Sequence, residues 1–343
     1  MTLRVGLIGF GLAGRYFHAP LIVASGMQLR AVVTRRADEV QQSFPEAIVV
    51  ASPAQLLSRE DIDLIVVASP TGMHFPHARD ALQSGRHVVV DKPLGLDTHE
   101  AVTLERLATD RGLTLSVFHN RRWDGDFLTL CRLKDEQRLG EISYFRARWD
   151  RFRPQVIDRW RERAEPGGGL LYDLGAHLID QALALFGRPE WIQADVFAQR
   201  AGAVTDDGFE ILMGKGALRI SLGVSSLART GDFRYCVHGS VGSFLKSGID
   251  PQEDQLRGGL QPLDPEFGVE PTSQWGQLVS ASDGTCERVA TEPGRWLEFY
   301  RQLRACLEHG TAPPVMAADA RRTVEIIEVA RRSSETESRI RLG

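Results

Sequence analysis

The sequence predicts an α/β fold in two domains: a parallel sheet covered by helices in the first third of the chain, then an α/β domain with a large, open, mostly antiparallel sheet. Short uncharged apolar runs alternate with helical segments up to about residue 120, as in parallel sheets buried on both faces. From Ile142 the pattern changes to alternating apolar and polar residues. A chain of 343 residues is also too long for a single domain with one core, and we place the two domains at 1–120 and 121–343.

Composition and charge narrow the classes of partner. Apolar residues make up 43% and charged residues 25%, the balance of a soluble globular chain. The 41 Lys and Arg against 45 Asp and Glu give a net charge of −4, which offers no field for nucleic acid or an anionic membrane. The four cysteines are too widely spaced for a metal centre or a disulfide scaffold, and no apolar run has the length of a signal or membrane segment. We therefore expect a cytoplasmic protein with a small-molecule ligand and no metal.

A glycine-rich turn follows the first predicted strand. Leu3–Ile8 is a short apolar run, and directly after it come Gly9, Phe10, Gly11, Leu12, Ala13 and Gly14. In a strand–turn–helix unit the first glycine permits the tight turn, the second lets a pyrophosphate approach the backbone, and the third lets the helix pack on the strand. Strand-like runs at Leu29–Val33 and Asp63–Ala68 supply the Rossmann context. The pattern predicts a dinucleotide site; the alternative is a glycine turn in another α/β protein.

The residues after the second strand bear on which dinucleotide binds. An acid at this place usually binds both ribose hydroxyls of NAD. Here the chain reads Thr34, Arg35, Arg36, and the first carboxylate is Asp38. Two guanidinium groups suit a 2′-phosphate and Thr34 can donate a hydrogen bond, so the sequence predicts NADP, with NAD as the second choice. The alternative is a pair of solvated arginines at a helix start.

A lysine follows another buried strand. Val88–Val90 is apolar, and Asp91, Lys92 and Pro93 come just after its carboxyl end, the edge at which open α/β sheets bind ligands. A lysine shielded from water beside an oxidised nicotinamide can act as a base toward a substrate hydroxyl, or as a proton donor to a carbonyl in reverse. The alternative is a surface lysine in a turn.

Other residues near strand ends are predicted to contact the ligands. The cofactor contacts are expected to include Ser69, Pro70, Thr71, His74, Asp91, Lys92, Pro93 and Asn120. For His74 a helix-capping role is equally open. Trp123 follows Asn120 where the predicted domains join, and we expect it to border the substrate.

A helix in the second domain carries the remaining candidate catalytic residues. Gly167, Gly168 and Gly169 lead into a helix that is predicted to run to about Phe186. Asp173 and His177 are four residues apart and therefore project from one side, with Asp180 close to them. His177 can donate or accept a proton and Asp173 can orient the substrate or the imidazole. The alternative is that the two side chains form a pair on the solvent face of the helix, or that His177 is a hydrogen-bonded histidine in the core.

The second sheet has alternating strands separated by turn residues. After Ile142 the expected strands are Ala194–Gln199, Gly208–Met213, Leu218–Val224, Arg234–His238 and Ser243–Leu245. Few helices are available to cover both faces, so the free face is predicted to meet a second subunit in a homodimer or homotetramer. Gly248–Gly276 is rich in Gly and Pro without periodicity, and is expected to be a mobile rim over the site.

Three motifs resemble the signatures of the Gfo/Idh/MocA oxidoreductases: the Gly9–Gly14 turn, Asp91-Lys92-Pro93, and the segment from Gly167 to Asp180. The likeness spans nearly the whole chain. Many members carry Glu where Asp91 stands, and the shorter acid keeps the charge. The segments 119–124 and 149–154 resemble the branch that includes NADP-dependent scyllo-inositol dehydrogenases.

The resemblance implies a Rossmann domain followed by an α/β domain, and hydride transfer between NAD(P) and a polyol or sugar. It places the catalytic lysine at Lys92 and the family's aspartate and histidine at Asp173 and His177. Lys92, Trp123, Asp173 and His177 are then the predicted substrate contacts, with the terminal proton carrier open between Lys92 and His177. The alternatives are a reductase of a dicarbonyl sugar such as anhydrofructose, and a non-catalytic NADP-binding sensor.

Overall fold

The computed structural model describes residues 2–343, and the chain divides into two compact units. The first unit contains the chain up to Asn120 together with Gln252–Phe267 and Arg295–Val324. The second contains Arg121–Pro251, Gly268–Gly294 and Glu325–Gly343. Two later segments therefore accompany the first 120 residues, and a domain boundary between residues 120 and 121 stays a prediction.

The first unit is built on a six-stranded sheet in which all neighbouring strands are parallel. The strand order is β3-β2-β1-β4-β5-β6. From β1 the chain adds strands first on one side, up to β3, and then on the other side, from β4 to β6. In doubly wound folds this switch point between β1 and β4 marks the edge at which ligands bind. The bounds are β1 (Arg4–Ile8), β2 (Gln28–Val33), β3 (Ile48–Val50), β4 (Leu64–Val67), β5 (His87–Asp91) and β6 (Leu115–Phe118). The predicted Rossmann domain is confirmed.

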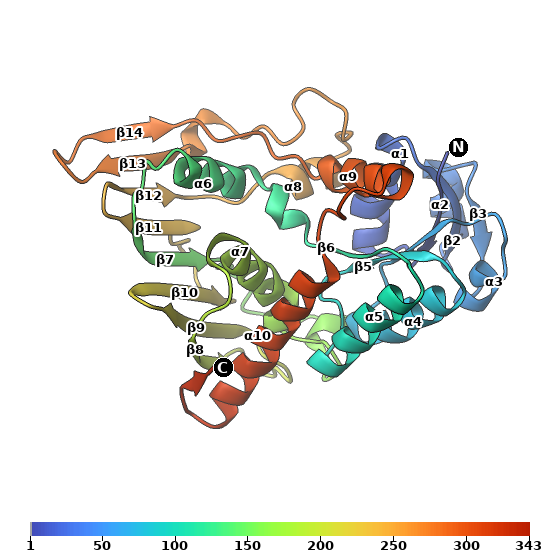
Figure 1. Cartoon of the computed structure of the whole chain (residues 1–343), viewed down its shortest axis with the longest axis horizontal. Helices are drawn as coiled ribbons and strands as arrows, with labels where there is room; N and C mark the ends of the chain where they lie inside the picture. The colour runs from blue at the N-terminus through green and yellow to red at the C-terminus, as the bar shows by residue number, and fades with distance from the viewer. Residues whose placement is uncertain (1) are drawn as a thin grey trace. The chain divides into compact units, whose positions relative to one another are not determined.

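Helices connect these strands, and two later helices, α8 and α9, join the same unit (Figure 1). They are η1 (Ala13–His18), α1 (Ala19–Ala24), α2 (Ala37–Ser43), α3 (Pro53–Leu57), η2 (Thr71–Met73), α4 (His74–Gln83), α5 (Thr98–Asp110), α8 (Gln252–Arg257) and α9 (Leu297–His309). Within the unit, α4 packs beside α5 and α1 contacts α9, so a segment from the end of the chain helps to cover the parallel sheet.

The second unit contains a nine-stranded sheet in the order β14-β13-β12-β11-β7-β10-β9-β8-β15. Only β7 and β10 pair in parallel, so the predicted mostly antiparallel sheet is confirmed. The bounds are β7 (Ile142–Arg148), β8 (Trp191–Phe197), β9 (Gly208–Lys215), β10 (Leu218–Ser225), β11 (Tyr235–Gly239), β12 (Gly242–Lys246), β13 (Gly276–Ser280), β14 (Cys286–Val289) and β15 (Ile340–Arg341).

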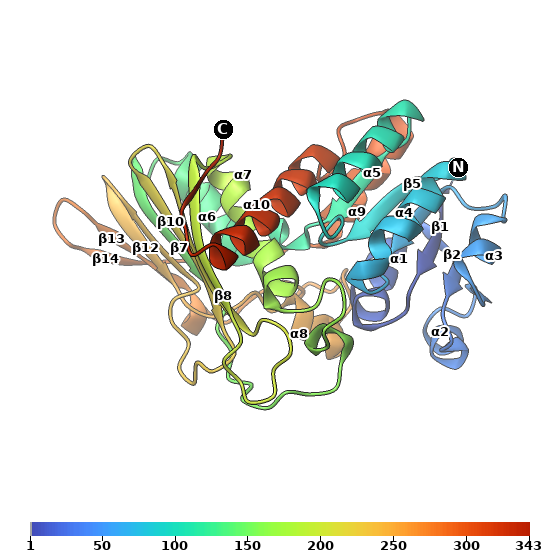
Figure 2. The same ribbon diagram turned by 90° about the horizontal axis from the view of Figure 1, so that it is seen from below.

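One face of this sheet packs against helices, as Figure 2 shows for α6, α7 and α10. The alternation in β7 decides which face: Phe145 and Ala147 are fully buried, whereas Tyr144 and Arg146 on the other face are half-buried. The remaining helices are η3 (Asn120–Trp123), α6 (Gly125–Asp135), η4 (Trp160–Glu162), η5 (Leu171–Gly175), α7 (Ala176–Phe186), η6 (Thr272–Gln274) and α10 (Ala317–Glu335). The second half of α10 supplies Ile326 and Ile327 to this core.

The segment 248–276, predicted to be a mobile rim over the site, contains regular structure. It contains α8, and its residues Gln252–Phe267 belong to the compact first unit. Gln252 is fully buried and its side-chain oxygen accepts a hydrogen bond from the backbone of Trp296 at 2.7 Å. This tertiary contact, which a local pattern does not show, fixes part of the segment. No described helix has both the length and the apolar character required to cross a membrane.

Candidate active site

The glycine turn after β1 has the geometry that a dinucleotide requires. Gly9 has a φ of +100°, and a Cβ there would lie 2.5 Å from the carbonyl oxygen of Ala68. A Cβ on Gly14 would lie 2.1 Å from the carbonyl oxygen of Gly9, so the helix start packs directly on the turn. At Gly11 an added Cβ would meet nothing within 4 Å. The outer glycines are thus needed for the fold, while Gly11 leaves bare backbone beside open space.

The helical segment that begins at Ala13 leaves its first amides available. Its first residues form a π-helical turn, and no side chain caps them. Unpaired N–H groups at a helix start favour an anion. Leu12 is 40% exposed at this start, whereas Phe10 is buried and packs edge-on against Phe44 at 6.3 Å. Phe10 therefore anchors the turn, and only its backbone is in a position to serve a ligand.

The end of β2 carries exposed arginines. Arg35 and Arg36 are exposed, and the Thr34 hydroxyl accepts a hydrogen bond from the backbone of Arg36 at 3.0 Å. Arg36 lies 3.8 Å from Glu39, which also pairs with Arg15. Within the described part of the chain, the Arg35 guanidinium has no ion pair. The first carboxylates occur on α2 and not at the strand end, so the tip of β2 has a positive charge available.

Two loops at the ends of β4 and β5 are joined by His74. Its Nδ1 lies 2.8 Å from the carbonyl oxygen of Pro93 and its Nε2 lies 2.9 Å from that of Ser69. The side chain is buried, and this burial lowers the pKa of His74. The residue stands at the C-cap of η2 through its backbone N–H, while its imidazole binds loop carbonyls and does not cap α4. His74 therefore holds Ser69-Pro70-Thr71 and Asp91-Lys92-Pro93 at fixed positions along one edge.

Lys92 lies directly beyond β5, which ends at Asp91. The Asp91 carboxylate accepts a hydrogen bond from the backbone N–H of Lys92 at 2.8 Å, and the Lys92–Pro93 peptide is cis. The lysine side chain is half-buried. Since β5 is separated from β1 by β4 alone, Lys92 and the glycine turn lie on the same edge of the parallel sheet.

A buried pair beneath this edge was not predicted from the sequence. His18 is fully buried, its Nδ1 lies 2.6 Å from the hydroxyl of Tyr300, and its Nε2 lies 4.0 Å from a carboxylate oxygen of Asp91. Burial lowers the pKa of His18 to about 4 and raises that of Tyr300. Tyr300 comes from α9, 282 positions away, so no local signal reveals the pair.

In the second unit, the glycine triplet fits against Asp206. Gly167 and Gly169 have φ values of +81° and +91°, and a Cβ on Gly169 would lie 2.1 Å from the carboxylate of Asp206. That carboxylate accepts a hydrogen bond from the backbone N–H of Leu171 at 2.7 Å, which supports the first turn of η5. The close neighbour of Gly169 is therefore the Asp206 side chain.

The three polar residues of the following helix have different surroundings. Asp173 has 19% of its side chain exposed and lies 3.2 Å from Nε of Arg161. His177 is 6% exposed, and its ring is tilted against that of Trp149 at 6.1 Å. Asp180 is buried and accepts two hydrogen bonds from Arg122, at 2.9 and 2.8 Å. Asp180 is therefore held in a structural ion pair, while Asp173 keeps access to solvent.

The predicted site residues thus form two groups. Those up to Asn120 belong to the first unit, which brings together the glycine turn, Thr34–Arg36, His74 and Lys92 at the carboxyl ends of neighbouring strands. Trp123, Asp173 and His177 belong to the second unit. Among the described residues, no group of three His, Cys, Asp or Glu side chains is arranged to hold a metal ion.

Comparison with known proteins identifies the class. An oxidoreductase-family model with an NAD-binding Rossmann fold matches residues 3–119, and the model of the family's C-terminal alpha/beta domain matches residues 134–342. The chain is therefore an oxidoreductase with an NAD-binding Rossmann domain. It belongs to the Gfo/Idh/MocA family.

Relatives match over nearly the whole length. The chain is 40% identical to scyllo-inositol 2-dehydrogenase (NADP(+)) IolW of Bacillus subtilis, covering 99% of this chain and 96% of that protein. It is 42% identical to the uncharacterized oxidoreductase YdgJ of Escherichia coli, covering 96% and 95%. The solved structure of yvaA from Bacillus subtilis superposes with a TM-score of 0.97 at 39% identity, covering 100% and 99%.

Proposed function

We propose that this protein transfers a hydride between NADP and a hydroxyl-bearing or carbonyl carbon of a polyol or sugar. The observation that carries the proposal is the shared edge of the parallel sheet, where the open glycine turn and Lys92 follow strands separated by β4 alone. The activity named for the relative IolW supports the substrate class and the choice of NADP.

The cofactor would be held along this edge. Gly9–Gly14 would bind the pyrophosphate, Thr34, Arg35 and Arg36 the 2′-phosphate, and the remaining contacts would come from Ser69, Pro70, Thr71, His74, Asp91, Lys92, Pro93 and Asn120. The open space at Gly11 and the exposed Arg35 fit such a group. Bound NADP supplies or accepts the hydride at C4 of its nicotinamide.

Proton transfer would fall to Lys92 and His177. The lysine ammonium can polarise a carbonyl oxygen or, when neutral, accept the hydroxyl proton, and an imidazole can do either. Asp173 would orient the substrate through its carboxylate, with Trp123 as a further contact. No protein-bound metal is required in this scheme.

The experiment is a substrate panel with both coenzymes. Absorbance of the reduced coenzyme reports turnover of inositol isomers, hexoses, sugar acids and dicarbonyl sugars, with NADP and NAD compared at equal concentration. We expect turnover of at least one polyol or sugar and a preference for NADP. Tight NADPH binding without turnover of any compound would favour the non-catalytic sensor instead.

We further propose a homodimer or homotetramer formed through the face of the nine-stranded sheet opposite α6 and α7. This face exposes Leu212 and keeps Tyr144 half-buried, so a second sheet has apolar surface to cover. Light scattering at micromolar protein measures the mass, and a monomer would contradict the proposal.

A further inference from the structure

The helix that carries Asp173 and His177 begins without a cap of its own. Leu170 stands at the start of η5, and it forms no side-chain cap there. The residue before it, Gly169, has no side chain to offer and holds a φ of +91°. The first amides of a helix have no acceptor within the helix, so they require acceptors from elsewhere.

Asp206 supplies these acceptors from a remote segment. Its backbone carbonyl oxygen accepts a hydrogen bond from the N–H of Leu170 at 3.1 Å, and its carboxylate accepts one from the N–H of Leu171 at 2.7 Å. The Cβ that any other residue would add at Gly169 lies 2.1 Å from this carboxylate. Glycine at this position therefore makes room for the acid that caps the helix.

The nine-stranded sheet fixes the backbone on which Asp206 is carried. The next residue, Asp207, donates its N–H to the carbonyl oxygen of Phe197 at 3.0 Å, at the end of β8. Its carbonyl oxygen accepts a hydrogen bond from the N–H of Ser226 at 3.2 Å, directly beyond β10. Because β8 and β10 are the two neighbours of β9, these bonds anchor the residues before β9 on both sides. The cap thus belongs to the sheet and not to a free loop.

Arg331 of α10 contacts both the capping acid and the capped turn. Its guanidinium lies 3.3 Å from the Asp206 carboxylate and 4.7 Å from the ring centroid of Tyr172 in η5. The Asp206 side chain is 7% exposed, and burial raises the pKa of its carboxyl group, while the bond from Leu171 and the charge of Arg331 act against that shift. The acid is therefore kept at the helix start in spite of its desolvation.

The helix start in turn sets the position of Asp173. The N–H of Asp173 donates to the carbonyl oxygen of Gly169 at 3.1 Å. The N–H of Gly169 donates to the carbonyl oxygen of Arg161 at 2.9 Å, and the Arg161 side chain lies 3.2 Å from the Asp173 carboxylate. The helix continues from η5 into α7, which places His177 one turn beyond Asp173. A shift of the capped turn would therefore move Asp173, its ion-pair partner and His177 together.

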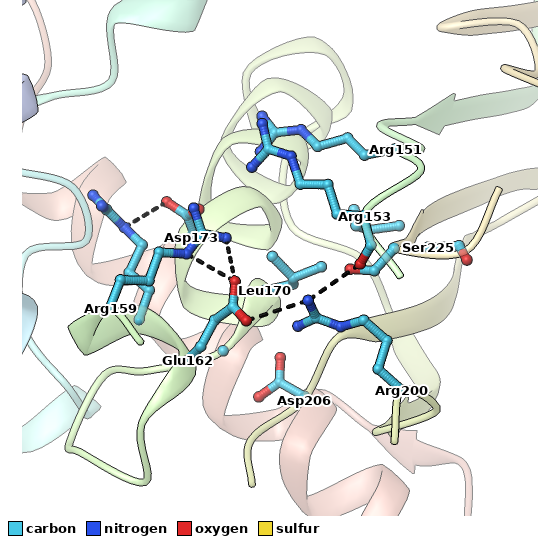
Figure 3. A pocket seen from close by; sticks show the side chains of 13 residues that line it. Arg151, Arg153, Arg159, Glu162, Leu170, Asp173, Arg200, Asp206 and Ser225 are labelled. Atoms are coloured by element: carbon cyan, nitrogen blue, oxygen red, sulfur yellow. Dashed lines mark hydrogen bonds and ion pairs between the residues drawn. The ribbon is translucent and has the colours of Figure 1, made fainter. Parts of the chain in front are cut away.

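Asp206 has no space for a substrate of its own. Together with Gly169, Leu170 and Asp173 it lines one small cavity of about 10 Å³, which holds a single water-sized group (Figure 3). The carbon skeleton of a polyol or sugar is larger than this. The Asp206 carboxylate therefore acts on Asp173 through the backbone of the helix, and not as a substrate contact.

We propose that Asp206 is a positioning residue for catalysis: it caps η5 from outside the helix and so holds Asp173 and His177 in the places from which they act on the substrate. The inference rests on the proposed function, because it takes these two residues to orient the substrate and to transfer the proton. A displacement of about 1 Å at a reacting centre can cost about a hundredfold in rate, so loss of the cap should reduce turnover.

Three variants test the positioning role with the best substrate of the panel. Asp206→Ala removes the acceptor for Leu171 and should lower kcat about a hundredfold, whereas Asp206→Asn keeps an acceptor oxygen and should stay within about tenfold of wild type. Asp207→Ala is the matched control, because the Asp207 carboxylate is 1% exposed and binds the amides of Gln199 and Arg200 instead of the helix. The control should keep kcat within about threefold, and all three should keep the Kd for NADPH within about twofold. Equal losses of kcat in the two alanine variants would overturn the proposal.

Amide hydrogen exchange tests the cap without turnover and separates it from the proposed function. In Asp206→Ala the backbone amides of residues 170–174 should exchange at least about tenfold faster than in wild type, because the helix start loses its acceptor, and Asp207→Ala should leave them unchanged. Unchanged exchange in Asp206→Ala, or faster exchange with a wild-type kcat, would overturn the proposal. Faster exchange in a protein that turns over no compound would support the cap, while the dehydrogenase function would fail in its own panel.

Discussion

The two units prepare their candidate sites with different chemical groups. In the first unit, the groups that face a ligand at the sheet edge are largely backbone amides, and Gly11 contributes open space. In the second unit, Asp173 lies among charged side chains, and the cavity beside it is lined by residues from Arg151 to Ser226. The candidate site of the first unit is thus built mainly from backbone groups, and that of the second unit from charged side chains.

This difference has a consequence for specificity. Backbone groups are supplied by the fold whatever the side chains are, so the first unit can bind the common parts of a dinucleotide with little dependence on sequence. A cluster of side chains changes its charge with a single substitution. Substitution of a charged side chain near Asp173 is therefore expected to change substrate choice more than a side-chain substitution around the glycine turn would change dinucleotide binding.

Lys92 is a side chain with a proposed chemical role at the backbone-built edge, and its removal should have the largest effect. Lys92→Ala is expected to lower kcat by about a thousandfold, as for loss of a general acid or base. NADPH affinity should change less than about threefold, because the glycine turn is intact. Steady-state kinetics and NADPH fluorescence titration measure both, with Lys134→Ala on α6 as the control. Near-normal turnover in Lys92→Ala would refute its role.

Substitution of two glycines of the turn, Gly14 and Gly11, distinguishes a role in folding from a role in coenzyme binding. Gly14→Ala places a Cβ 2.1 Å from the carbonyl oxygen of Gly9, and we expect a loss of about 3 kcal/mol in the free energy of unfolding. Gly11→Ala meets no atom within 4 Å, so its stability should stay within about 0.5 kcal/mol of wild type while NADPH binding weakens. Urea unfolding and fluorescence titration make the comparison. Equal destabilisation by both variants would show that Gly11 has a folding role as well.

His18 gives the first unit a pH dependence that its backbone groups lack. Its pKa is lowered from 6.5 to about 4 by burial, so the folded protein binds fewer protons than the unfolded chain between these values. The contribution to stability is complete above pH 6.5 and is lost as the pH falls toward 4. Between pH 7 and 4.5 wild type should lose about 2 kcal/mol more than His18→Gln in urea unfolding. Parallel losses in the two proteins would contradict this.

The features that could be predicted are those encoded within a few residues. Buried strands such as β4 and β5 have short apolar runs, the glycine turn has its spacing, and the helix carrying Asp173 and His177 has its periodicity and its terminal Gly187. β3 has three residues and β15 two, too few for a pattern, and both depend on their neighbours in the sheet.

The features that could not be predicted depend on contacts between remote segments. Tyr300 meets His18 across 282 positions, and Asp206 supports Leu171 across 35. The ion pair of Arg161 with Asp173 likewise joins two segments, and nothing in the local sequence around Arg161 indicates it. Hydrophobic periodicity predicts which face of a helix or strand is buried. It does not predict which charged residue from another segment pairs with a side chain on that element.

Arg35 offers the smallest effect, and it shows how a side chain selects within a site built from backbone. Its guanidinium is exposed and has no ion pair in the described residues, whereas Arg36 lies 3.8 Å from Glu39. Arg35→Ala should raise the Kd for NADP about tenfold and leave that for NAD unchanged, because only NADP carries the 2′-phosphate. Arg36→Ala should change it less, since part of its charge is already compensated. Fluorescence titration with both reduced coenzymes measures the two affinities. An equal loss of affinity for NADPH and NADH would mean that Arg35 supports the turn at the end of β2, and that the backbone, not this side chain, sets the coenzyme preference.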